Sequence, residues 1–62
     1  MADPRHALAL AEELGEETGR KVAARQLKAA EVRCPYGEAT SRAAWKRGYE
    51  RGAGRPFKEP ED

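Results

Sequence analysis

Apolar residues recur at helical spacing over the first part of the chain, and no strand-like alternation appears anywhere in it. Asp3 followed by Pro4 is typical of a helix start, because aspartate accepts hydrogen bonds from free backbone N–H groups and proline suits the first helical position. The pattern predicts a first helix over about residues 4–14. One stripe of that helix would carry Ala7, Leu10, Ala11 and Leu14.

Two glycines, Gly15 and Gly19, then interrupt the pattern. Each costs about 1 kcal/mol relative to alanine in a helix interior. On one straight helix, Leu27 would also lie about 220° around the axis from Leu14. We therefore expect either two shorter helices, the second over about residues 18–32, or one helix that bends near the glycines. The second stretch would place on one face Ala23, Ala24, Leu27 and Ala30.

The segment from Val32 to Gly37 is expected to break the helix, because Pro35 disfavours the helical conformation at the residue before it. A last helix is predicted over about residues 38–52, since glycines follow it as a stop signal. Residues 56–62 hold two prolines and three acids and are expected to form a flexible, disordered tail. The predicted fold is one all-α domain over residues 1–55, a hairpin-like arrangement of two or three helices.

Composition limits how much core such a chain can build. The 62 residues are 39% hydrophobic and 37% charged, with one tryptophan. Trp45 is therefore expected in the core, packed on Leu10, Leu14 or Leu27. Cys34 is the single cysteine and is expected to be a small buried hydrophobe, with no disulfide, metal or cofactor. The chain lacks a secretory signal and the roughly 20 apolar residues of a membrane span, so a cytoplasmic location is expected.

The net charge of +1 conceals an uneven distribution. Residues 1–31 have a net charge of −1, residues 32–55 of +4, and residues 56–62 of −2. On the last helix, Trp45 and Tyr49 share one face, whereas Arg47 and Arg51 form a pair on a neighbouring face. Clustered arginines suit phosphate groups, so the sequence predicts an RNA-binding surface. Its residues would be Arg42, Lys46, Arg47, Arg51 and Arg55.

Residues 34–52 carry a specific pattern: Cys34-Pro35-Tyr36, then Arg42, Trp45, Gly48 and Tyr49. This pattern resembles the bacterial ribosome modulation factor family. The resemblance implies two main helices joined by a linker. It also implies binding to the small ribosomal subunit near the 3′ end of its rRNA, which modulates translation by ribosome hibernation. By the same resemblance, a scaffold role falls to Cys34, Pro35, Tyr36, Trp45, Gly48 and Tyr49. Gly48 in addition leaves a gap where another backbone or a nucleotide can approach closely.

Two alternative functions remain open. Some short proteins similar to this family are described as ATP-dependent modifiers of fluoroquinolone antibiotics. This chain lacks the Gly-x-x-x-x-Gly-Lys-Ser/Thr phosphate-binding loop, and catalysis is not expected. The second alternative is a protein-interaction module, in which the face with Leu10 and Leu14 forms a homodimer seam.

Overall fold

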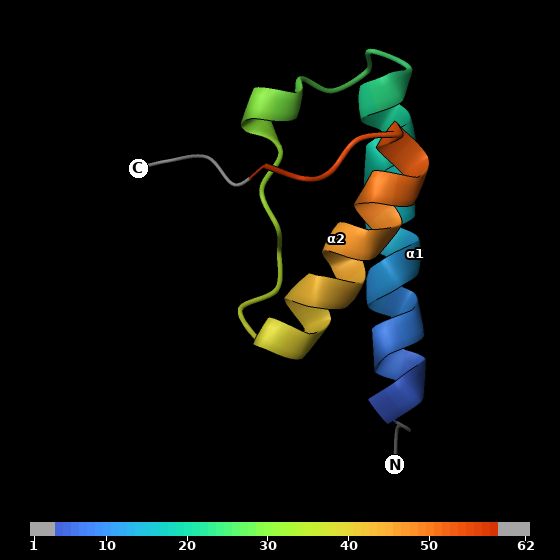
Figure 1. Cartoon of the computed structure of the whole chain (residues 1–62), viewed down its shortest axis with the longest axis vertical. Coiled ribbons are helices and arrows are strands. Elements are labelled where there is room, and N and C mark those ends of the chain that lie inside the picture. The colour runs from blue at the N-terminus through green and yellow to red at the C-terminus, as the bar shows by residue number, and fades with distance from the viewer. Residues whose placement is uncertain (1–3, 59–62) are drawn as a thin grey trace.

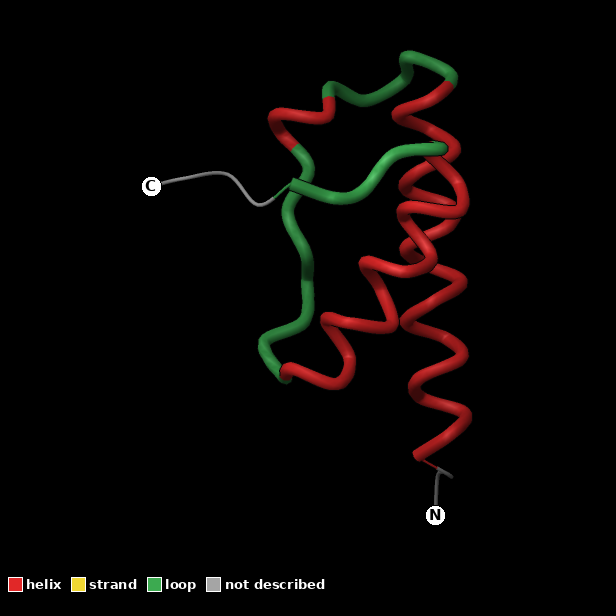
Figure 2. Tube along the Cα trace, viewed as in Figure 1, coloured by secondary structure: helices red, strands yellow, loops and turns green. Residues whose placement is uncertain are grey.

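The computed structural model of the chain describes residues 4–58. It contains two α-helices, α1 (Pro4–Ala23) and α2 (Ala39–Ala53), and a short 3₁₀ turn, η1 (Ala29–Glu31). The turn lies within the connector, residues 24–38, that joins the two helices (Figure 1). Figure 2 shows helix and loop throughout the described residues, and no strand. The prediction of an all-α fold is confirmed.

The first helix passes through both glycines without a break. The expected division into helices over residues 4–14 and 18–32 is wrong, because α1 runs from Pro4 to Ala23 and residues 24–32 contain the 3₁₀ turn instead of an α-helix. Gly15 and Gly19 are buried in α1 at the crossing with α2. Tertiary packing at that crossing offsets their low helix propensity, which was the basis of the expected break.

The two helices touch along their backbones at four glycines. A Cβ atom added at Gly15 would overlap the carbonyl oxygen of Trp45, and one added at Gly48 would overlap that of Glu12. Gly19 and Gly52 meet the opposite helix in the same way, one turn further on. Glycines four residues apart on each helix therefore form a groove without side chains, into which the other backbone fits. We call Gly15, Gly19, Gly48 and Gly52 the glycine contact.

Both helices run in the same direction. Gly15 lies against Trp45 and Tyr49, and Gly19 lies against Tyr49 and Ala53, so residue numbers rise together along the crossing. In Figure 1 the connector leaves the end of α1, runs back along the molecule and enters the start of α2. The predicted hairpin-like arrangement is therefore wrong. An extended chain spans about 3.3 Å per residue, so residues 24–38 are long enough to return beside the helices.

The core lies on the side of α2 that faces the connector. Trp45 and Tyr49 are 1% and 2% exposed, and Val32 of the connector completes the buried cluster. The expected packing of Trp45 on leucines is wrong, because each of the three leucines stays more than a third exposed. They are Leu10 at 47%, Leu14 at 40% and Leu27 at 43%. Close backbone contact at the glycines places Ala11, not these leucines, against α2, since Ala11 is fully buried.

Phe57 packs against the core as a third aromatic ring. Its ring lies 4.9 Å from that of Trp45 and 5.1 Å from that of Tyr49, edge to face in both cases, and the latter two rings stack at 5.5 Å. The segment expected to form a flexible tail, residues 56–62, thus contains a packed aromatic side chain at its second position. Residues 59–62, which contain the three acids of that tail, lie outside the described residues. The domain extends at least to Phe57.

Candidate functional site

α2 has three faces, and other parts of the chain cover two of them. One face holds Gly48 and Gly52 against α1. The second holds Trp45 and Tyr49 against the connector. Helical geometry leaves a third face, which we call the outward face, formed by Ala43, Lys46, Arg47 and Glu50. Because two of the three faces are occupied by the fold, a partner that approaches α2 meets the outward face.

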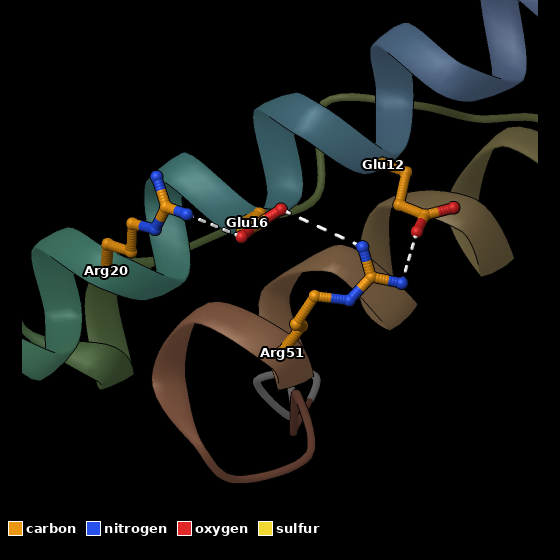
Figure 3. Close-up of polar contacts among 4 residues, drawn as sticks. All are labelled: Glu12, Glu16, Arg20 and Arg51. Carbon is orange, nitrogen blue, oxygen red and sulfur yellow. Dashed lines mark hydrogen bonds and ion pairs between the residues drawn. The ribbon is translucent and has the colours of Figure 1, made fainter.

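Arg51 does not belong to the outward face. Its guanidinium nitrogens lie 2.6 Å from a carboxylate oxygen of Glu12 and 3.8 Å from one of Glu16 (Figure 3). Glu16 also accepts a hydrogen bond of 2.7 Å from Arg20 one turn along α1. The structure therefore gives Arg51 a different role from the predicted RNA contact. It ties α2 to α1 beside the glycine contact.

Ion pairs neutralise much of the negative charge of the glutamates on α1. Three of the four glutamates of α1 lie in ion pairs, because Lys21 approaches Glu17 at 3.7 Å in addition to the pairs of Glu12 and Glu16. These side chains are partly exposed, so each pair contributes at most about 1 kcal/mol to stability. Their larger effect is on the surface potential, since carboxylates paired within the protein repel a polyanion less.

The remaining predicted RNA-binding residues divide between two places. Arg47 is exposed on the outward face, between a hollow of about 480 Å³ that it shares with Arg5 and one of about 370 Å³ that it shares with Lys46. Arg42 and Lys46 are half-buried, and each has an interaction of its own. Arg55 lies beyond the end of α2, in a different pocket from Arg47.

Arg55 lies beside two cations that are not among the predicted RNA-binding residues. It lines a pocket of about 430 Å³ together with Arg25 and Lys28 of the connector. All three side chains are exposed. Arg55 follows the predicted end of the last helix, but Arg25 and Lys28 were inside the expected helix over residues 18–32. No signal in the sequence placed the three together, because their meeting depends on where α1 ends and on the parallel arrangement. We call the pocket formed by Arg25, Lys28, Arg55 and Leu27 the cationic pocket.

The family-like motif is used to build the core. Cys34 and Tyr36 are half-buried against the Trp45 cluster, and the exposed Pro35 lies between them in an extended segment. The Cys34 thiol lies 3.7 Å from the backbone carbonyl of Tyr36. The gap at Gly48 is filled by the backbone of α1. Cys34 and Tyr36 thus contribute to the core, and Gly48 has no room for a nucleotide. The scaffold role of the whole motif stays a prediction.

Leu10 and Leu14 lie side by side, one turn apart, on a part of α1 that α2 does not cover. Such exposure is a requirement of the homodimer seam expected from the sequence, and it is also ordinary for scattered surface leucines. The homodimer therefore stays a prediction.

Within residues 4–58, no three side chains of His, Cys, Asp or Glu gather as metal ligands do. Neither helix of this described range is both long enough and apolar enough to cross a bilayer. No protein-family model, curated protein or solved structure matches the chain.

Proposed function

We propose that this protein binds structured RNA, and specifically the rRNA of the small ribosomal subunit, through the outward face of α2. The function would be to modulate translation, as the resemblance to the ribosome modulation factor family implies. Arg47 is the central contact in this proposal, with Lys46 beside it. The supporting observation is that α2 turns its aromatic rings inward while Arg47 stays exposed on the opposite side.

Charge supports the same surface. α2 carries Arg42, Lys46, Arg47 and Arg51 against Glu50 alone, a net charge of +3. Glu50 is the one carboxylate on the outward face itself. On α1, Glu12, Glu16 and Glu17 are ion-paired and oppose RNA binding less. A guanidinium group can donate two parallel hydrogen bonds to a phosphate, which makes Arg47 the residue best suited to the contact.

A pair of matched variants tests the proposal. Arg47→Gln and Arg51→Gln remove the same charge from positions one turn apart on α2. We expect Arg47→Gln to weaken binding to purified small ribosomal subunits by about tenfold, because one charge-assisted hydrogen bond contributes about 1.5–3 kcal/mol. It should also reduce the slope of log affinity against log salt concentration by about one. Arg51→Gln should lose clearly less affinity than Arg47→Gln, because Arg51 contacts carboxylates of α1 and acts on RNA only through their charge.

Co-sedimentation over a range of salt concentrations measures both quantities, and circular dichroism verifies that each variant is helical. Equal losses in the two variants would mean that binding follows net charge and not the outward face. Unchanged binding in Arg47→Gln would remove this face from the interaction altogether.

A further inference from the structure

The ends of α1 and α2 lie together because the helices are parallel. The cationic pocket is formed at this end of the molecule, with Val22 and Ala53 from the two helices in its wall. Its volume of about 430 Å³ falls within the roughly 300–1,000 Å³ usual for small-ligand sites. Its charged lining residues are Arg25, Lys28 and Arg55, and no carboxylate is among the residues that line it.

Arg25 occupies a backbone conformation that favours glycine. Its φ angle is +62°, and it is the one non-glycine residue with positive φ among those described. The Arg25 N–H donates to the carbonyl of Val22 at 3.0 Å, and the Gln26 N–H donates to that of Lys21 at 2.8 Å. This pair of hydrogen bonds is the Schellman ending of a helix, whose left-handed position is usually glycine. α2 ends conventionally in this respect, with Gly54 at φ +75°.

An arginine at this position is therefore costly to the fold, and glycine would relieve the strain. Strained residues of this kind cluster at functional sites. Cations near helix C-termini also offset the helix dipoles, but that effect is available from Arg20, Lys21 and Arg51, which lie in the last turns themselves. The helix dipole therefore does not explain why a strained arginine follows the helix. It also does not explain why Arg25 lines a pocket together with two more cations.

We infer that the cationic pocket binds a backbone phosphate of RNA, with the adjoining nucleoside against the exposed side chain of Leu27. Arg25, Lys28 and Arg55 would donate hydrogen bonds to the phosphate oxygens, and Arg25 is held in place by its backbone hydrogen bonds. Leu27 is 43% exposed and offers an apolar surface to a sugar or base. The inference rests on the proposed function for the identity of the partner, but it concerns a second site with residues distinct from the outward face.

Arg25→Gly provides a test in which stability and binding change in opposite directions. Relief of the left-handed strain should raise the melting temperature by a few degrees. The affinity for a short, labelled RNA hairpin should fall several-fold, because one phosphate donor is lost. Lys28→Gln should weaken RNA binding similarly without the gain in melting temperature. Arg51→Gln, which removes the same charge from an internal ion pair, is the control. Fluorescence anisotropy and thermal denaturation give the two readouts.

Wild-type RNA affinity in the Arg25→Gly protein would overturn the inference, whatever its melting temperature. Loss in Arg47→Gln with retention in Arg25→Gly and Lys28→Gln would overturn the pocket and leave the outward face standing. The reverse pattern would support the pocket and overturn the outward face. A wild-type protein that binds neither the labelled RNA nor purified small ribosomal subunits overturns both. If uridine monophosphate alone binds as tightly as the oligonucleotide, the pocket takes a free nucleotide and its assignment to an RNA backbone is wrong.

Discussion

Gly48→Ala is expected to remove about half of the protein's stability, although alanine is the better helix former. A methyl group at position 48 would collide with the carbonyl oxygen of Glu12 and lie 2.9 Å from the amide nitrogen of Glu16. These are backbone atoms of α1, which cannot swing aside as a flexible side chain does. The two helices must move apart, and the ion pair of Arg51 with Glu12 must stretch with them.

The magnitude follows from two opposing terms. Alanine at an exposed helix position would add about 1 kcal/mol of stability. Overpacking typically costs about 1–3 kcal/mol and occasionally more. We expect the upper end of that cost, and so a net loss of about 2 kcal/mol, because the clash involves backbone on both sides. A domain of this size has roughly 3–5 kcal/mol of stability in total, so the loss is about half of the free energy of unfolding.

Gly37→Ala is the matched control for this prediction. Gly37 lies in the connector with no atom within 4 Å of an added Cβ. That variant should unfold at nearly the wild-type urea concentration, as measured by circular dichroism. If Gly48→Ala were as stable as Gly37→Ala, the close backbone contact of the two helices would be refuted.

Local signals in the sequence predicted the last helix well. The limits of about 38–52 compare with Ala39–Ala53, because Pro35 before the helix and the glycines after it act on their immediate neighbours. The burial of Trp45 was also predictable from composition, since the chain has few other large apolar side chains that could form a core. These features depend on short-range chemistry and composition, which a single sequence displays.

The first helix was divided wrongly because its glycines were judged by propensity alone. Gly15 and Gly19 stand four residues apart, and so do Gly48 and Gly52. The close approach inferred at Gly48 applied to all four positions, and the matching spacing was the signal that two helices pair there. What the sequence does not contain is the direction of the pairing. That direction determines that Arg51 meets Glu12 and Glu16, and that Arg55 meets Arg25 and Lys28.

The candidate sites were correspondingly harder to predict than the fold class. Arg47 and Arg51 look alike in the sequence, one turn apart on a basic helix. They differ because the acids of α1 reach one position and not the other, and that depends on how closely the glycines let the helices approach. An arginine's availability to RNA is thus decided by residues more than thirty positions away in the chain.

Trp45→Ala is expected to abolish the fold. The indole is 1% exposed and contacts the rings of Tyr49 and Phe57, while the Val32 side chain packs on it from the connector. Removal of a buried tryptophan side chain costs about 3–5 kcal/mol, which equals the whole stability expected for a domain this small. The connector and the segment that carries Phe57 would then lose the surface on which both rest.

Because Trp45 is the single tryptophan, the intrinsic fluorescence of the wild-type protein reports on the core. Its emission should be that of an indole shielded from water and should shift to longer wavelength on unfolding. Trp45→Ala must be followed by far-ultraviolet circular dichroism, where we expect loss of most helical signal. Leu14→Ala, at a residue 40% exposed, should cost less than about 1 kcal/mol. If Leu14→Ala were the more damaging substitution, the core would lie on the leucine face of α1, and α2 would be free to present its rings to RNA.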